Sequence, residues 1–218
     1  MTSVWPWVTL ALLGAYHGIN PGMGWLFAVA RGLQEQRRDA VFQSLVPIAL
    51  GHAASIALVV AVVGGIQMVA APRPVRLAGA AALILFGVFK LVRPRSHPRW
   101  VGMRIGAGEL AVWSFLMATA HGAGLMLFPV LLALPPSPHD HGAHHAHGVA
   151  AMGLGPASLG QDAAAVLVHT LAMLVVMGAV AFVVYEKVGL AILRRAWINL
   201  DFIWATAIVA AGVFTLFT

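Results

Sequence analysis

The chain contains no cysteine, and only 9% of its 218 residues are charged. The absence of cysteine excludes disulfides, thiolate metal sites and thiol catalysis. Soluble domains carry about 25% charged residues, so this chain has too little polar surface to cover a globule in water. Apolar residues make up 61% of the sequence, and the mean hydropathy is +0.89. We therefore expect an integral membrane protein.

Six apolar stretches are long enough, or nearly so, to cross a bilayer as helices. Because they occupy most of the chain, little room remains for a soluble catalytic or nucleic-acid-binding domain. We expect no enzymatic activity and no nucleic-acid partner. The predicted fold class is an all-α polytopic membrane protein with six transmembrane helices. The predicted spans are 5–30, 41–66, 77–92, 106–134, 163–185 and 197–217.

The distribution of basic residues predicts the orientation of these spans, because short cytoplasmic loops are enriched in lysine and arginine. Eleven of the thirteen Lys and Arg residues follow the first, third and fifth spans. Only Arg73 and Arg76 fall on the other side. We therefore expect both termini outside the cytoplasm, together with the loop 135–162. The expected location is the bacterial inner membrane, with lipid around the helices.

Three short sequence matches recur in the same order in the two halves of the chain. "AYHGIN" at 15–20 matches "TAHGAG" at 119–124, "ALGHAAS" at 49–55 matches "VLVHTLA" at 166–172, and "GVFKLV" at 87–92 matches "GVFTLF" at 212–217. They divide the chain into a first repeat, 1–104, and a second repeat, 105–218. Three spans per repeat place the halves in opposite orientations. Inverted repeats of this kind are typical of secondary transporters, whose substrate sites lie near the bilayer midplane.

Four histidines lie within the predicted spans, where burying an ionisable group is costly and usually serves a function. They form two repeat-related pairs, His17 with His121 and His52 with His169. Neutral imidazole binds Zn, Cu, Fe or Ni and also relays protons. A single histidine of this kind is more often a hydrogen-bonded core residue. The set of four favours a metal or proton path.

Other side chains near these histidines extend the candidate metal site. Asn20 follows His17 in a Pro- and Gly-rich stretch that predicts a broken helix, while Met117 and Met173 stand four residues from His121 and His169. Methionine at helical spacing is more often core filling than a ligand, but a mixed His/Met site would suit Cu(I). Two acids near predicted cytoplasmic ends are candidates for a gate or proton site, namely Glu109 and Asp201.

The loop between the fourth and fifth spans is rich in histidine and has no Lys or Arg. Short histidine-rich tracts bind divalent metals flexibly and with little selectivity. We interpret this loop as a metal-gathering segment, the alternative being a solvated linker. Its candidate residues are His139, Asp140, His141, His144, His145 and His147.

The 3+3 plan, the "HG" histidine in the first span of each half and the histidine-rich loop together resemble the nickel/cobalt exporter branch of the lysine exporter superfamily of small membrane transporters. The resemblance implies proton-coupled or potential-driven movement of a divalent cation, with His17 and His52 as ligands. The family pattern carries an aspartate shortly after the first-span histidine. Here "HGINPG" offers Asn20 instead, which leaves nickel, copper, zinc or a non-metal substrate open.

The sequence thus favours a secondary transporter for a transition-metal ion of the Ni, Co, Zn or Cu class. Three alternatives stay open: a membrane subunit that binds haem between histidines, a metal-handling subunit of a larger enzyme complex, and an organic-solute exporter of the lysine exporter type. The metal, the direction of transport and the coupling ion are left undetermined. The chain is a candidate for homo-oligomerisation or for assembly with a membrane-complex partner.

Overall fold

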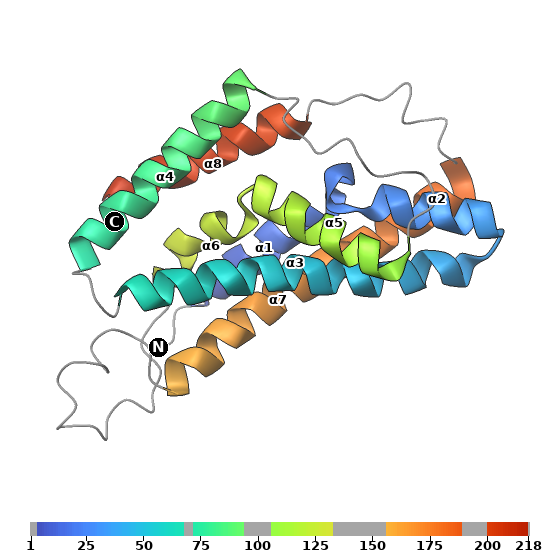
Figure 1. Cartoon of the computed structure of the whole chain (residues 1–218), viewed down its shortest axis with the longest axis horizontal. Coiled ribbons are helices and arrows are strands. Elements are labelled where there is room, and N and C mark those ends of the chain that lie inside the picture. Colours follow the sequence, from blue (N-terminus) through green and yellow to red (C-terminus); the bar gives the residue numbers. More distant parts are fainter. Residues whose placement is uncertain (1–3, 68–71, 94–105, 133–155, 189–199, 218) are drawn as a thin grey trace.

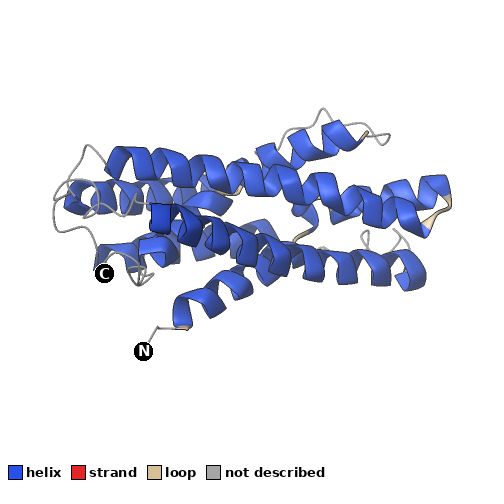
Figure 2. Cartoon of the chain, turned by 90° about the horizontal axis from the view of Figure 1, so that it is seen from below, coloured by secondary structure: helices blue, strands red, loops and turns tan. Residues whose placement is uncertain are grey.

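The structure is a computed structural model that describes residues 4–67, 72–93, 106–132, 156–188 and 200–217 (Figure 1). Within these ranges all regular structure is helical, so the all-α prediction is confirmed for them (Figure 2). The elements are α1 (Trp5–Ile19), η1 (Pro21–Met23), α2 (Trp25–Glu35), α3 (Arg38–Gln67), α4 (Pro72–Val92), α5 (Ala107–Ala120), α6 (Ala123–Leu132), α7 (Pro156–Val183), η4 (Val184–Val188) and α8 (Leu200–Phe217).

The first predicted span is broken into α1, the 3-10 turn η1 and α2. The helix α1 ends at Ile19 because the next residue, Asn20, has an extended backbone with ψ 118°. Its side-chain oxygen accepts a hydrogen bond from the backbone N–H of Gly22 at 2.9 Å and so caps the short turn. Gly24 then adopts φ 118°, a conformation that side chains rarely allow.

The fourth predicted span is broken at the corresponding place. The helix α5 ends at Ala120, and α6 begins at Ala123 with its axis bent by 58° from that of α5. Gly122 lies between them with φ 69°. The two "HG" matches of the sequence repeat therefore both lie where a helix stops and a second one starts.

Packing pairs helices from different halves of the chain. The helix α1 packs against α7, α3 packs against α5, and α4 lies beside α8 at one edge of the bundle (Figure 1). Two of these contacts are backbone to backbone at a glycine. A Cβ at Gly14 would collide with the backbone of His169, and a Cβ at Gly51 would collide with that of Ala111. Only glycine permits these close approaches, which hold the middle of α7 against α1 and of α5 against α3.

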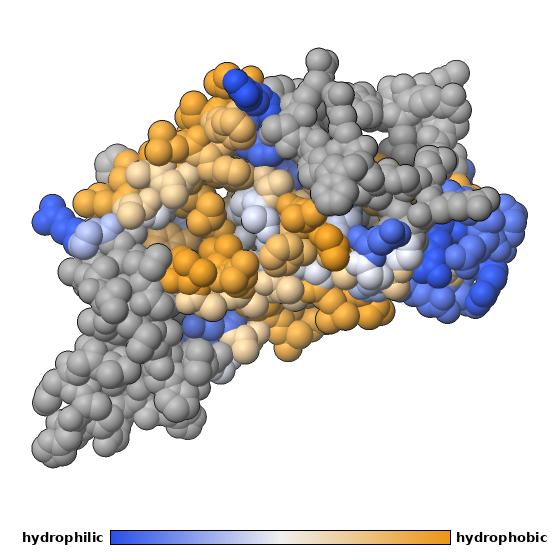
Figure 3. Space-filling model, viewed as in Figure 1, coloured by the Kyte–Doolittle hydropathy of each residue, from blue (hydrophilic) through white to orange (hydrophobic). Residues whose placement is uncertain are grey.

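The surface carries many large apolar side chains. Leu12 and Leu50 are each 64% exposed and Val175 is 70% exposed, and apolar surface covers much of the visible face while polar residues gather around the α2–α3 turn (Figure 3). Buried side chains instead include many small and polar residues. This distribution is compatible with a protein surrounded by lipid, where apolar exposure costs nothing.

The number of helices that could cross a membrane is smaller than the sequence predicts. In the described residues, two helices are long and apolar enough by themselves, over Arg38–Val63 and Gly160–Lys187. The bent pair α5 and α6 makes a third if it counts as one span, and the apolar parts of α4 and α8, Leu77–Val92 and Ala205–Leu216, are shorter. Six predicted stretches are thus helical, but only two or three meet the length criterion for a span.

Candidate metal centre

His17 lies in the last turn of α1, directly before the helix break. Its Nδ1 donates a hydrogen bond to the carbonyl of Leu13, one turn earlier, at 2.8 Å. In a neutral imidazole this bond places the proton on Nδ1 and leaves Nε2 as the nitrogen with a lone pair. The side chain is completely buried. The end of α1 thus holds the ring in one orientation, with Nε2 as the nitrogen whose lone pair can ligate a metal.

His52 and His169 face each other from the middles of α3 and α7. Their rings are parallel within 8°, and the two Nε2 atoms are 3.3 Å apart. His169 Nδ1 donates to the carbonyl of Leu10 on α1 at 3.2 Å. Because that bond fixes the proton of a neutral His169 on Nδ1, its Nε2 accepts the hydrogen bond and His52 Nε2–H donates it.

The three histidines converge in one buried cluster, although they come from three helices. The ring centroid of His17 lies 5.2 Å from that of His52 and 4.8 Å from that of His169. One nitrogen of each ring lies within 4.8 Å of the others, and all three residues are 0% exposed. We call this cluster the histidine triad; its members lie close enough together to hold a metal ion.

The spacing of the triad suits a first-row transition metal. In a tetrahedral site with metal–nitrogen distances of about 2.0–2.1 Å, two ligating nitrogens lie about 3.3–3.4 Å apart. The His52–His169 distance already has this value, and a nitrogen of His17 lies within 4.8 Å of the other two ligand atoms. Within the described residues the cluster contains histidine alone, without a carboxylate. A neutral nitrogen site of this kind matches Zn, Cu, Ni or Co rather than Mg or Ca.

One triad nitrogen lacks the outer hydrogen bond that metal-ligating histidines usually make. His52 Nδ1 is buried and has no hydrogen-bonding partner among the residues that the structure describes. His17 and His169 both have such a bond, to the carbonyls of Leu13 and Leu10. For His52 to bind a metal through Nε2, its proton must leave the ring or move to Nδ1. His52 is therefore the triad member whose proton has to be displaced.

His121, the fourth histidine of the sequence prediction, lies beside the triad. It ends α5, is 2% exposed, and its Nδ1 donates to the carbonyl of Met117 at 2.8 Å. A Cβ on Gly22 would lie 3.7 Å from His121 Nε2 and 3.2 Å from Asn20 Oδ1, so the ring faces the break between α1 and α2. It is near enough to His17 and His52 to interact with them electrostatically.

The remaining predicted ligands are near the cluster but have other contacts. Asn20 is 5% exposed, and its side-chain oxygen is the cap of the 3-10 turn. Met117 is 3% exposed and supplies the carbonyl that orients His121. Met173 is completely buried and packs in a core that also contains Met23 and Met177. All three lie in the interior near the triad, and whether they ligate stays a prediction.

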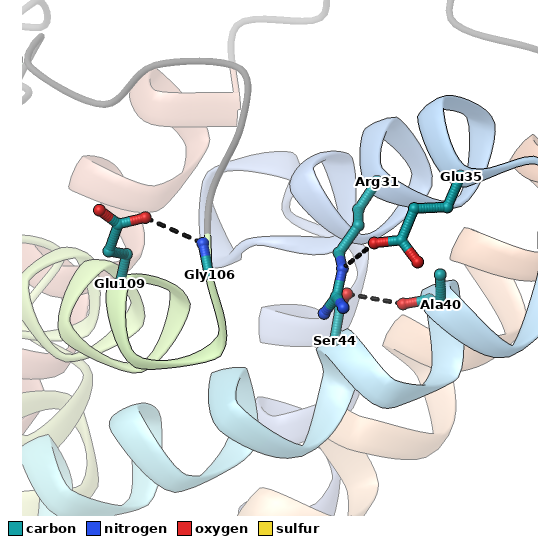
Figure 4. Close-up of polar contacts among 6 residues, drawn as sticks. All are labelled: Arg31, Glu35, Ala40, Ser44, Gly106 and Glu109. Atoms are coloured by element: carbon teal, nitrogen blue, oxygen red, sulfur yellow. Dashed lines mark hydrogen bonds and ion pairs between the residues drawn. The ribbon is translucent and has the colours of Figure 1, made fainter.

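The structure gives less information on the two predicted gate residues, Glu109 and Asp201, than on the histidines. Glu109 is exposed in the first turn of α5, where its carboxylate accepts a hydrogen bond from the backbone N–H of Gly106 at 2.8 Å (Figure 4). Twelve residues of α5, about 18 Å, separate it from His121, so its visible role is to cap a helix. Asp201 belongs to α8, but its side chain lies outside the description. The six loop residues, His139 to His147, lie outside the described residues as well.

Sequence reasoning missed the polar contacts that join α3 to α5 next to the triad. Ser55, one turn after His52, forms a 2.8 Å hydrogen bond with the hydroxyl of Thr119. Ser114 donates to the carbonyl of Ile48 at 2.7 Å and is 1% exposed. Small hydroxyl residues within apolar helices were the available signal, since such residues often hydrogen-bond across helices in membranes.

Comparison with protein-family models, curated proteins and solved structures finds no match to this chain.

Proposed function

We propose that this chain is a secondary transporter that moves a transition-metal ion of the Ni, Co, Zn or Cu class across the bacterial inner membrane. The observation that carries the proposal is the buried histidine triad, in which His17, His52 and His169 converge from α1, α3 and α7. Three helices are thereby joined at one point in the interior. An ion bound there is a substrate in passage, held by ligands on elements that can move relative to one another.

The chemistry of the triad supports a transported ion. Imidazole is neutral when it ligates, so an ion held by three imidazoles keeps its positive charge in a buried site, and this favours its release. Protonation of an imidazole competes with metal binding, which couples metal affinity to pH. When His52 Nε2 ligates, its proton moves to Nδ1 of the same ring, so this shift releases no proton. A transporter needs both properties, because its substrate has to leave and its cycle has to be driven.

The broken helices support a site at membrane depth. Non-helical backbone is tolerated there only where it is buried in protein or lines a water-filled cavity. The break at Asn20–Gly24 is buried or half-buried and lies next to His17, and the break at His121–Gly122 is also buried. Transporters place substrate sites at breaks of this kind. In the proposed topology α1 with α2, and α5 with α6, each form one broken span among six.

The helix pairing supports the inverted repeat of 1–104 and 105–218. The sequence repeat matches the break after α1 to that after α5, α3 to α7, and α4 to α8. An exchange of the two halves turns the α1–α7 contact into the α5–α3 contact and leaves α4–α8 unchanged. All three pairings are among the close helix contacts of the fold. The triad then lies at the interface between the two repeats.

Haem binding is the alternative that packing supports least. A porphyrin between axial histidines would have to fit between the helices that carry them. A Cβ at Gly14 would collide with the backbone at His169, and one at Gly18 would lie 2.5 Å from the carbonyl of Met173. α1 and α7 are therefore in backbone contact on both sides of His17. A metal-handling subunit and an organic-solute exporter remain alternatives that the experiment below separates.

The test is metal flux in cells that express the full chain. Cellular Ni, Co, Zn and Cu are measured by elemental analysis after exposure to each salt, for the wild type, His52→Asn, His169→Asn and Thr170→Val. Thr170→Val is the matched control, because it changes a buried neighbour of His169 without removing an imidazole. We expect the cellular content of one metal to change in cells that express the wild type or the control. It should not change in cells that express either histidine variant. Flux that is unchanged in both histidine variants would overturn the proposal.

A further inference from the structure

In the proposed repeat, the histidine triad corresponds to a second set of residues, His121, His169 and His52, which shares two members with it. His17 corresponds to His121, at an offset of 104 residues, and His52 corresponds to His169, at an offset of 117. The triad contains one member of the first pair and both members of the second. When the halves exchange roles, His17 is replaced by His121, whereas His52 and His169 replace each other.

His17 and His121 have similar positions and hydrogen bonds, so either ring can serve as the third ligand. His17 lies in the last turn of α1, and His121 is the residue that ends α5. Each donates from Nδ1 to the carbonyl four residues earlier, and both bonds measure 2.8 Å. In both rings the ligating nitrogen is thus Nε2, and the outer hydrogen bond is of the kind that orients metal-bound histidines. His121 has the orientation of a ligand although it stands outside the triad.

The helix contacts place the two rings on corresponding helix pairs. The helix α1 carries His17 and packs on α7, the helix of His169; α5 carries His121 and packs on α3, the helix of His52. The close approach of α1 to α7 brings the rings of His17 and His169 within 4.8 Å. The end of α5 already lies against α3, where Thr119 and Ser55 form a 2.8 Å hydrogen bond, so a movement of His121 itself would bring its ring to His52.

The two halves differ in one hydrogen bond. His169 Nδ1 donates to the carbonyl of Leu10 on α1. The repeat offset aligns Leu10 with Ser114, so the corresponding bond would run from His52 Nδ1 to the Ser114 carbonyl on α5. His52 Nδ1 instead has no partner among the described residues. The hydrogen bond from His169 to α1 is therefore present, and the corresponding bond from His52 to α5 is absent. This difference is expected if the structure represents one of two related arrangements of the repeats.

We propose that His52 and His169 form a shared pair that holds the transported ion first with His17 and then with His121. This inference rests on the proposed transport function and describes its central step. One metal–Nε2 bond, to His17, breaks and one, to His121, forms, while the two bonds to the shared pair persist. The oxidation state of the ion does not change, and the Nδ1 protons of His17 and His121 stay with their carbonyls. In the second state the Ser114 carbonyl accepts a hydrogen bond from His52 Nδ1.

The shared pair explains why a path needs four histidines when three suffice to bind. An ion that exchanges one ligand keeps most of its coordination, so it need not regain its water shell inside the protein. The exchange also requires His121 to move toward His52 from the break between α5 and α6, which connects the position of the ion to the arrangement of the two repeats. Inverted repeats that alternate between two related arrangements are the usual basis of such coupling.

The test measures Zn²⁺ binding and Zn²⁺ flux separately in four variants: His17→Asn, His121→Asn, the double variant and His52→Asn. Asparagine keeps a donor near the position of Nδ1 for the Leu13 and Met117 carbonyls but lacks Nε2. Binding is measured by equilibrium dialysis of detergent-purified chain without residues 139–147, and flux in proteoliposomes. Thr170→Val is the control, and size-exclusion profiles identify any variant that does not fold. A variant that does not fold is replaced by the corresponding glutamine, which is judged by the same outcomes.

We expect each single variant, His17→Asn or His121→Asn, to keep one bound Zn²⁺, because a complete triad remains. The double variant should bind about 100-fold more weakly or worse, and flux should be lost in all variants except the control. The shared-pair inference fails if His17→Asn alone abolishes binding, or if His121→Asn transports like the wild type. Full binding and flux in His52→Asn would instead overturn the proposed function itself.

Discussion

His52 Nε2 lies 3.3 Å from His169 Nε2, although the two residues are 117 positions apart and belong to helices in different halves of the chain. Both rings are buried, and they are parallel within 8°. A hydrogen bond holds the two nitrogens at the separation that a tetrahedral transition metal requires of its ligands. The approach of α3 and α7 at this point therefore sets the spacing that the proposed metal site needs, with the His52 Nε2 proton still to move.

Gly14→Ala is expected to lower thermal stability in detergent, because the added Cβ would collide with the backbone of His169 and push α7 away from α1. Overpacking of this kind costs about 1–3 kcal/mol. Gly51→Ala should behave alike through its contact with Ala111. Gly108→Ala, whose Cβ would meet nothing within 4 Å, is the control. Unfolding temperatures for Gly14→Ala and Gly51→Ala that equal the control's would show that these helices are not in backbone contact.

Ser114→Ala should destabilise the fold by about 1 kcal/mol, because it removes a buried hydrogen bond between α5 and α3. The comparison is Thr9→Ala, which removes a bond to a carbonyl of its own helix at an exposed site and should stay within about 0.5 kcal/mol. Denaturation of both variants in the same detergent measures the difference. Equal losses in the two variants would contradict a structural role for the Ser114–Ile48 contact.

The predicted orientation of the chain in the membrane can be determined by labelling variants with one introduced cysteine, because the chain has no cysteine of its own. A membrane-impermeant maleimide added to spheroplasts should label Gly160→Cys, at the end of the predicted outer loop. It should label Arg37→Cys, on the predicted cytoplasmic side, only after permeabilisation. Both positions are exposed in the structure, so accessibility is limited by the membrane alone. The reverse labelling pattern would invert the topology, and equal labelling would argue against a membrane between the two sites.

Deleting residues 139–147 should lower the total metal bound by the purified chain while leaving one ion in place. We expect the five histidines of this segment to bind metal weakly and with little selectivity, whereas the members of the triad come from three helices. Metal retained after dialysis of the shortened chain is counted by elemental analysis. A shortened chain that holds no metal would place all binding in the loop.

The sequence was sufficient to find the candidate residues but not their assembly. His17, His52, His121 and His169 were identified because polar groups within apolar stretches are rare, and all four are buried. Periodicity could not show that His52 meets His169, since this depends on how α3 packs against α7. The carbonyl of Leu10, which orients His169, has no sequence signal because every residue carries one.

The helices illustrate the same limit. Apolar composition located all six helical stretches, and Pro21 with its flanking glycines indicated a break after His17. The break after His121 was less evident, since it depends on the positive φ of Gly122 rather than on a proline. Hydropathy alone also predicted that each of the six stretches crosses the membrane. In the part of the chain that the structure describes, two or three helices meet the length criterion instead of six, because backbone breaks divide the first and fourth stretches and the apolar parts of α4 and α8 are short.

X-ray absorption at the zinc edge, on Zn²⁺-loaded chain lacking residues 139–147, tests metal binding at the triad most directly. Zinc held by the triad should show a shell of three imidazole nitrogens at about 2.0–2.1 Å, and this bound zinc should be lost in His52→Asn but not in Thr170→Val. A zinc shell without imidazole, or a three-imidazole shell that persists in His52→Asn, would contradict the claim that the triad holds the ion.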